Sequence, residues 1–217
     1  MNVVVTGAGG FVGRELVRLL AGAGHAVTGI DSAGGGIPED AQAVIGDIGE
    51  RAVRAEALDG GCDALIHLAT VPGGAAEADP AASRRINIDA MYDLLLEAAA
   101  VNPGLRVVYA SSIAVFGDPL PPLVDDATPL SPKMIYGGHK AMMEAAVAMF
   151  SNRGLIDGVS VRLPGILARP KVPSGMKSAF MSDLFHALKA GEEFICPVTA
   201  QGRIWRSEEH TSELQSL

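Results

Sequence analysis

The chain has 217 residues, 48% of them hydrophobic, and a formal net charge of −8 at pH 7. This length and apolar content predict one folded domain with a sizeable core and exclude a disordered chain. The acidic balance contains no run of lysine or arginine, which argues against a nucleic-acid partner. No apolar run reaches the roughly 18 residues of a membrane span, and the first residues lack the basic start of a signal peptide. We therefore expect a soluble, cytoplasmic protein with no membrane partner.

Cysteine usage points the same way. Cys62 and Cys196 lie far apart in the sequence, which fits free thiols in a reducing compartment better than a disulfide framework. The histidines, cysteines and acidic residues show no spacing typical of a metal site, so no metal is expected.

Short apolar runs alternate along the chain with longer segments of helical periodicity. Enrichment in Val, Ile and Leu is typical of strands that are buried on both faces. We expect strands at 2–7, 26–31, 41–47, 63–69, 106–112 and 158–164. We expect helices near 11–23, 50–58, 80–101, 133–153 and 177–190. Strands separated by helices pair in parallel through right-handed crossovers, so the sequence predicts an α/β fold with a doubly wound parallel (Rossmann) sheet.

The first strand is followed by the turn GAGGFVG, in which Gly7, Gly10 and Gly13 lie three residues apart. Glycines let the backbone approach a pyrophosphate, and the helix that follows offers its first amides, at Phe11 and Val12, with a positive dipole end. A tight turn without a ligand is the alternative. The position between the first strand and the first helix favours phosphate binding.

Two acidic residues end the next strands. A carboxylate at Asp31 would accept hydrogen bonds from a ribose and repel a 2′-phosphate, so NAD is expected rather than NADP. A turn cap is the alternative, but no basic residue follows in SAGGG. Asp47, after the third strand, either caps a helix or contacts the adenine, and the sequence leaves both open.

The fourth strand leads to a further group of candidates. Thr70 and Val71 follow it and are expected to border the nicotinamide and the substrate, whereas His67 is expected to be packed in the core. In the next helix, which Asp79 caps ahead of a proline at the first turn, Asn87 is either a buried amide that braces the active-site backbone or an exposed polar residue.

Ser111 and Ser112 end the fifth strand, at the sheet edge where open α/β sheets bind ligands. A strand-end cap is the favoured role for Ser111. Beyond a loop rich in Pro and Asp at 117–132, Tyr136 precedes Lys140 by about one helical turn, so the two side chains share a helix face. The two glycines between them weaken a helix. They either let a ligand approach or ease helix packing.

The end of the chain carries two further features. Arg162 and Arg169 flank LPGILA, and either could meet a substrate carboxylate, although a surface salt bridge is commoner for arginine. The segment RSEEHTSELQS at 206–216 lacks the periodicity of a core, and one codon choice for it reads as a common sequencing-library adapter. It is therefore expected to be non-native.

Taken together, these residues resemble the extended branch of the short-chain dehydrogenase/reductase superfamily. The matching features are Thr6-Gly7-x-x-Gly10-x-x-Gly13, Asp31, Asp47-Ile48, HLA at 67–69, Asn87, Ser112, and Tyr136 with Lys140. Within that branch, SSIAVFGDPLP, RLPGILARP and SGMKSAFMSDLFHAL are similar to D-erythronate dehydrogenases, which are often labelled nucleotide-sugar epimerases.

The resemblance implies a division of the chain and a set of site residues. We expect an NAD-binding Rossmann domain at 1–170, the start of a largely missing substrate-binding subdomain at 171–205, and the tail at 206–217. The expected catalytic residues are Ser112, Tyr136 and Lys140. The expected cofactor contacts are Gly7, Gly10, Phe11, Val12, Gly13, Asp31, Asp47, Ile48, Leu68, Ala69, Thr70, Asn87, Tyr136, Lys140 and Pro164. The expected substrate contacts are Ser111, Ser112, Val71 and Arg169. The family also implies a homodimer through a four-helix interface formed by the helices near 80–101 and 133–153.

Electrostatics supports this chemistry. Moving the pKa of a phenol from near 10 to about 7 requires roughly 4 kcal/mol, and an ammonium about 4 Å away supplies a similar amount at an effective dielectric constant near 20. Lys140 is thus predicted to activate Tyr136, which removes a hydroxyl proton as hydride leaves for NAD, while Ser112 hydrogen-bonds the same oxygen.

The predicted function is the NAD-dependent oxidation of a secondary hydroxyl of a small sugar acid. A nucleotide-sugar epimerase or dehydratase is the alternative enzyme. A nonenzymatic NAD-sensing protein is disfavoured by the presence of the tyrosine–lysine pair.

Overall fold

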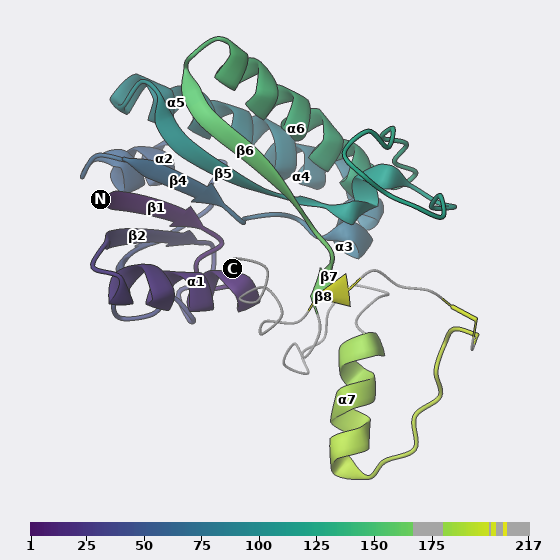
Figure 1. The fold of residues 1–217 in the computed structure, drawn as a ribbon. Helices are drawn as coiled ribbons and strands as arrows, with labels where there is room; N and C mark the ends of the chain where they lie inside the picture. Colours follow the sequence, from purple (N-terminus) through teal and green to yellow (C-terminus); the bar gives the residue numbers. More distant parts are fainter. Residues whose placement is uncertain (167–179, 200, 203–205, 208–217) are drawn as a thin grey trace.

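A six-stranded parallel sheet forms the centre of the molecule in a computed structural model, which describes residues 1–166, 180–199, 201–202 and 206–207 (Figure 1). The strands are β1 (Asn2–Thr6), β2 (Ala26–Asp31), β3 (Gln42–Ile45), β4 (Ala64–His67), β5 (Leu105–Ser112) and β6 (Ile156–Leu163). They lie in the order β3-β2-β1-β4-β5-β6, and every neighbouring pair is parallel. The chain reverses direction across the sheet between β1 and β4, and open α/β sheets bind ligands at such a switch point.

Helices cover both faces of the sheet, which confirms the doubly wound fold (Figure 1). One face carries α1 (Phe11–Gly22), which packs on a cluster that includes Val3, Val5 and Val27. The other face carries α2 (Arg51–Leu58), α5 (Met91–Val101) and α6 (Ile135–Asn152).

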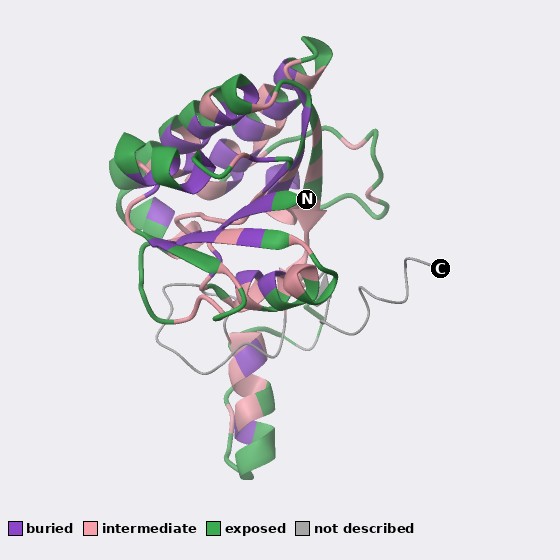
Figure 2. Ribbon diagram, turned by 90° about the vertical axis from the view of Figure 1, so that its left-hand side faces the viewer, coloured by how far each residue is buried: buried purple, intermediate pink, exposed green. Residues whose placement is uncertain are grey.

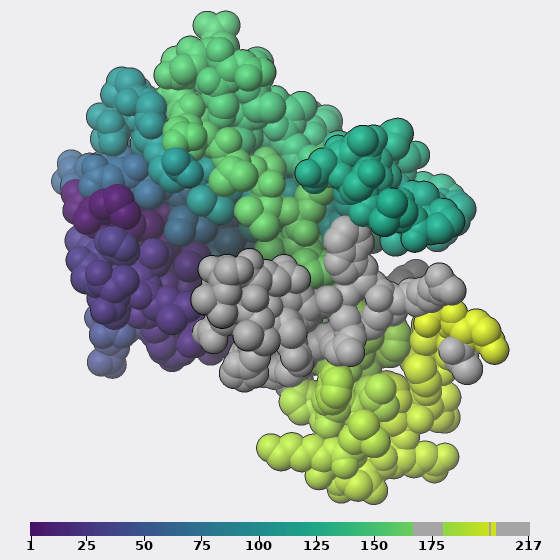
Figure 3. Space-filling view, viewed as in Figure 1, coloured from purple at the N-terminus to yellow at the C-terminus, as the bar shows by residue number. Residues whose placement is uncertain are grey.

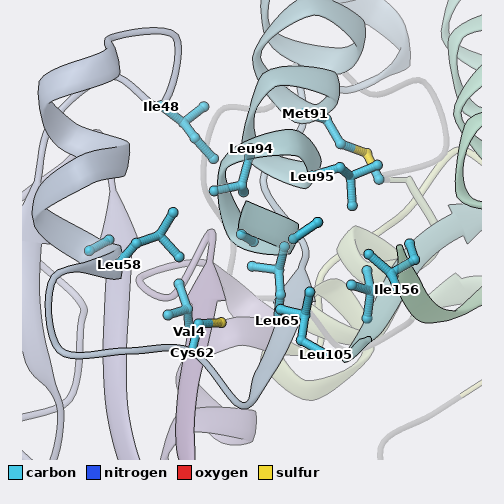
Figure 4. Close-up of a cluster of buried hydrophobic side chains, with 14 of the residues drawn as sticks. Val4, Ile48, Leu58, Cys62, Leu65, Met91, Leu94, Leu95, Leu105 and Ile156 are labelled. Carbon is cyan, nitrogen blue, oxygen red and sulfur yellow. The ribbon is translucent and has the colours of Figure 1, made fainter. Parts of the chain in front are cut away.

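The larger core lies beneath α2, α5 and α6. Val4 and Leu65 point into it from β1 and β4, and Leu94 and Leu95 meet them from α5 (Figure 4). Fully burying each such side chain stabilises the fold by about 1.5–3 kcal/mol. This core holds the strand ends in place, and the candidate site is built on them.

The predicted strands are all present, and each helix prediction within the described residues overlaps a helix. The segment predicted as one helix at 80–101 is divided into α4 (Pro80–Arg84), a π-helical turn η1 (Arg85–Ala90) and α5. Asp79 caps α4 through a hydrogen bond from the Ala82 amide, which confirms the predicted helix start. The segment at 117–132 forms the expected, largely exposed loop.

Two short elements were not predicted from the sequence. Residues Gly73–Ala78 form α3, which begins with two glycines, and Ile113–Phe116 form the 3₁₀ turn η2. Both elements flank the start of α6, so they matter for the site.

Helix α7 (Phe180–Ala190) lies apart from the layered body (Figures 1 and 3). A two-stranded parallel sheet joins β7 (Gly165–Ile166) to β8 (Arg206–Ser207). β8 falls at the start of the segment predicted to be non-native. No helix within the described ranges is long and apolar enough to cross a membrane, and none of those residues form a cluster of three or more metal-binding side chains.

Candidate active site

Within the described part of the chain, the predicted residues that follow the strands gather at the carboxyl edge of the sheet because all six strands point the same way. The glycine turn follows β1, Asp31 ends β2, Leu68 to Val71 follow β4, Ser112 ends β5, and Pro164 follows β6. The start of α6 brings Tyr136 to the same edge through its contacts with α3 and η2.

Two glycines of the turn, Gly7 and Gly13, leave no room for a side chain. Gly7 has a φ of +69°, and a Cβ atom on it would lie 2.9 Å from the amide nitrogen of Ala69. A Cβ atom on Gly13 would lie 2.1 Å from the Gly7 carbonyl oxygen, which also accepts a hydrogen bond from the amide of Gly10 at 3.0 Å. Gly10 is exposed, and no side chain caps the start of α1 there. The turn therefore presents bare backbone to solvent at the positive end of α1, which suits a diphosphate.

Asp31 is held by two backbone amides. Its Oδ2 accepts from Gly9 and its Oδ1 from Ala33, each at 3.0 Å. A carboxylate oxygen accepts more than one hydrogen bond, so the half-buried carboxylate keeps the capacity to accept from the hydroxyls of a ribose.

Asp47 and Ile48 have partners within the protein. The carboxylate of Asp47 accepts from Arg85 at 2.6 Å and from the Gly49 amide at 2.7 Å, and the bond from Arg85 lowers the pKa of the carboxyl group. Because α2 begins only after Glu50, Asp47 closes a turn and does not cap that helix. Ile48 points into the core (Figure 4), and its carbonyl oxygen accepts from the buried Arg54.

A buried threonine joins the ends of β1 and β4. Thr6 Oγ1 accepts hydrogen bonds from the amides of Leu68 (3.2 Å) and Ala69 (3.1 Å). Its own proton then goes to Nδ1 of His67, 2.9 Å away, so the imidazole carries its proton on Nε2. His67 is packed inside the protein, as expected. Burial, with a smaller contribution from the charge of Lys140, lowers its pKa to about 3.

Asn87 is buried and uses its whole amide to hold the loop after β4. Its Oδ1 accepts from the Val71 amide (2.7 Å) and the Thr70 hydroxyl (3.1 Å). Its Nδ2 donates to the Val71 carbonyl (3.0 Å) and to Ser83 Oγ (3.1 Å). Asn87 lies in the π-helical turn η1, a feature that is frequent at functional sites. Asn87 is therefore a buried amide that braces the loop after β4, and it is not an exposed polar residue.

Lys140 is buried beside Tyr136. Its Nζ donates to the carbonyl of Ala110 at 2.7 Å, and lies 5.6 Å from the centroid of the Tyr136 ring and 4.8 Å from that of Tyr109. Only 2% of Lys140 is exposed, and this desolvation lowers its pKa to about 7. From the sequence we expect an ammonium at Lys140. In the structure the lysine is itself close to titration, so a developing phenolate and the ammonium stabilise each other.

The two glycines between the tyrosine and the lysine differ in role. A Cβ atom on Gly137 would lie 2.4 Å from the carbonyl oxygen of Ala114 in η2, so glycine lets α6 pack directly on that turn. For Gly137 the structure therefore supports helix packing as the reason for glycine. A Cβ atom on Gly138 would meet nothing within 4 Å, so the packing of the protein does not require glycine at this position.

Ser112 and Ser111 point to different surroundings. The half-buried Ser112 caps η2 by accepting from the Ala114 amide at 3.2 Å, which leaves its hydroxyl proton to donate. Ser111 is buried and donates to Glu144 at 2.5 Å. Glu144 also pairs with Arg162 at 2.8 Å, so Arg162 forms an ion pair, but a partly buried one and not the surface salt bridge that the sequence favoured. Arg169, a predicted substrate contact, lies outside the described residues.

Comparisons with known proteins show the family to which the chain belongs. Residues 3–210 match the model of the NAD dependent epimerase/dehydratase family. The chain is 37% identical over 218 residues to a D-erythronate dehydrogenase of Cupriavidus necator, covering 94% of this chain and 67% of that protein. A D-erythronate dehydrogenase of Haemophilus influenzae is 33% identical over 223 residues, with coverage of 97% and 69%. The crystal structure of a nucleoside-diphosphate-sugar epimerase from Agrobacterium tumefaciens superposes with a TM-score of 0.85 at 32% identity, covering 98% of this chain and 66% of that one.

The buried His67 predicts a pH-dependent stability. Its folded pKa of about 3 lies below the ordinary value of 6.5, so the unfolded chain takes up a proton first as the pH falls through 6.5. Each pH unit below that value then lowers the free energy of unfolding by up to about 1.4 kcal/mol. In His67→Asn the amide oxygen still accepts from Thr6 but does not titrate. Urea unfolding at pH 7 and pH 5 is expected to show about 2 kcal/mol less acid destabilisation in this variant than in the wild type. Equal losses in the two proteins would contradict the assignment.

Proposed function

Because the chain belongs to the NAD dependent epimerase/dehydratase family, we propose that it oxidises a secondary hydroxyl of a small sugar acid, of which D-erythronate is the first candidate. Two relatives named D-erythronate dehydrogenase, at 37% and 33% identity, support this substrate class. The chain spans about two thirds of the length of these relatives, 67% and 69%.

NAD is the proposed cofactor, and when bound it supplies the hydride acceptor. The bare turn at Gly7 to Gly13 and the amides of Phe11 and Val12 would hold the diphosphate. Asp31 would accept from the ribose hydroxyls, and the absence of a basic residue in SAGGG favours NAD over NADP. Leu68, Ala69, Thr70 and Pro164 would border the nicotinamide.

Three side chains would take part in removing the proton of the substrate hydroxyl. Tyr136 would take the proton of the substrate hydroxyl, Ser112 would donate a hydrogen bond to the same oxygen, and Lys140 would stabilise the phenolate. Among their neighbours, Val71 would touch the substrate, whereas the hydroxyl of Ser111 is already engaged with Glu144.

The observation that carries the proposal is the burial of Lys140. An amine that is 2% exposed and meets a carbonyl oxygen and two phenol rings loses most of its hydration. No salt bridge to it is found within the described residues, and only desolvation shifts its pKa. A group that lowers stability in this way is typical of a functional site. The buried amine of Lys140 is explained if Tyr136 has to release a proton, because the ammonium stabilises the phenolate.

The first test separates a dehydrogenase from its alternative. The Agrobacterium tumefaciens structure, named an epimerase, favours a nucleotide-sugar epimerase as the second candidate. A dehydrogenase is expected to accumulate NADH with D-erythronate and related sugar acids, whereas an epimerase returns the hydride and releases none. NADH absorbance measured with sugar acids and with UDP- or GDP-sugars decides between them.

Tyr136→Phe tests the proposed base. Loss of a general base typically lowers the rate by about 10²–10⁴-fold. The variant is expected to lose turnover to that degree while its Kd for NAD changes little. Tyr92→Phe on the exposed side of α5 is the matched control and is expected to keep full activity. Full turnover by Tyr136→Phe would exclude the proposed role.

Lys140→Met tests the cost of the buried amine. Because the folded pKa of about 7 lies below the ordinary 10.5, the ammonium destabilises the fold at pH 7, and the wild type recovers stability as the pH rises from 7 to 10.5. Allowing for the lost hydrogen bond to Ala110, we expect the free energy of unfolding of Lys140→Met at pH 7 to exceed that of the wild type by about 2–4 kcal/mol. Its advantage should shrink toward pH 10. Lys133→Met, at an exposed site before α6, is the control. A less stable Lys140→Met would refute this account.

A second copy of the chain is the proposed occupant of the outer face of α5 and α6. Leu96 and Met142 are 48% and 52% exposed there, and Tyr92 joins the two helices by edge contact with the ring of Phe150, 5.3 Å between centroids. Exposed segments of these helices are visible in Figure 2. The double variant Leu96→Glu/Met142→Glu is expected to shift a dimer to a monomer in analytical ultracentrifugation. Leu19→Glu on α1, across the sheet, should leave the mass unchanged.

A further inference from the structure

A chain of buried hydrogen bonds joins the helix that carries Tyr136 and Lys140 to the loop after β4. His139 lies between those two residues in the sequence, and its side chain turns toward α4 while Lys140 turns toward β5. Its Nδ1 lies 3.0 Å from Oγ of Ser83, and both groups are buried. Ser83 in turn accepts from Asn87, whose amide holds the backbone of Val71.

Each group in this series of hydrogen bonds has a donor or acceptor role that is consistent with the number of its protons. Asn87 donates both Nδ2 protons, one to the Val71 carbonyl and one to Ser83, and its Oδ1 accepts two hydrogen bonds. Ser83 accepts one of these bonds and keeps its own proton, which Nδ1 of a neutral His139 accepts in the tautomer that carries the ring proton on Nε2. Burial lowers the pKa of His139, against the smaller opposing effects of Glu77 and Asp89, which keeps the ring neutral at pH 7.

The same two regions are tied together a second time along the chain. The loop at Val71 runs directly into α3, and Glu77 of α3 accepts from the amide of Ile135 in the first turn of α6 at 2.7 Å. The Glu77 contact is exposed, whereas the His139–Ser83–Asn87 contacts are buried. Hydrogen bonds are electrostatically stronger when they are shielded from water, so the inner connection is expected to be the firmer of the two.

We propose that His139 is a positioning residue that acts through Ser83 and Asn87 to hold the backbone at Val71 in register with the tyrosine–lysine helix. For its catalytic consequence the inference rests on the proposed function, because Val71 borders the proposed nicotinamide and substrate positions. The structural part stands independently of any activity.

Hydrogen exchange of the segment at 68–72, measured by mass spectrometry on the whole chain, tests the connection directly. His139→Leu removes the acceptor, and Ser83→Ala removes the central link. Each loss leaves a buried donor without a partner, which costs about 1–3 kcal/mol. Both variants are expected to accelerate exchange at 68–72 by about tenfold or more. His139→Asn, whose amide oxygen can take the place of Nδ1, is expected to retain most of the protection.

Ser151→Ala is the matched control. Ser151 lies at the far end of α6 and accepts from the amide of Gly158 at 3.1 Å, so its loss weakens the packing of the same helix without touching the loop. The inference is wrong if Ser151→Ala accelerates exchange at 68–72 as strongly as Ser83→Ala, or if neither His139→Leu nor Ser83→Ala accelerates it. If Ser83→Ala fails to fold, the comparison of His139→Leu with His139→Asn decides.

Turnover provides the second measurement. His139→Leu is expected to lower kcat about tenfold, with the Kd for NAD within about threefold, and His139→Asn is expected to restore kcat. A wild-type protein that forms no NADH with any sugar acid would refute the proposed function. The exchange result at 68–72 would still decide the inference about His139.

Discussion

The hydroxyl of Thr6 is the contact on which the candidate site depends. It accepts hydrogen bonds from the amides of Leu68 and Ala69 and donates one to His67. These contacts join the ends of β1 and β4, where the strand order reverses. Gly7, one residue on, lies so close to Ala69 that a side chain would not fit. The glycine turn and the loop after β4 are therefore set against each other, and a ligand that crosses the sheet edge meets both in fixed positions.

Stability and function oppose each other around this junction. Thr6 and His67 form a buried polar pair, and the amine of Lys140 is buried as well. Lys140 lowers the pKa of His67, and its own pKa falls to about 7. A core of apolar side chains would be more stable at these positions. The protein instead keeps an amine beside Tyr136, with the rest of α6 bound to the sheet and to α3, α4 and η2.

Much of the site could be predicted from local sequence because its chemistry follows from short patterns. The turn at Gly7 to Gly13, the carboxylate of Asp31 and the spacing of Tyr136 and Lys140 each belong to one strand end or one helical turn. What the sequence left open was decided by contacts between distant segments. Asp47 pairs with Arg85, Ser111 with Glu144, and His139 with Ser83, and no periodicity reveals such partners.

By itself the sequence determined the alternation of strands and helices, the parallel sheet, and which residues reach its carboxyl edge, because strand and helix periods and glycine turns are local properties of the chain. Only the tertiary structure decided that Asn87 braces a loop from within a π-helical turn, that α3 caps α6, and that Lys140 is buried enough to lose its permanent charge. Those outcomes depend on which segments exclude water from one another, and burial is a property of the packed molecule and not of any short stretch of it.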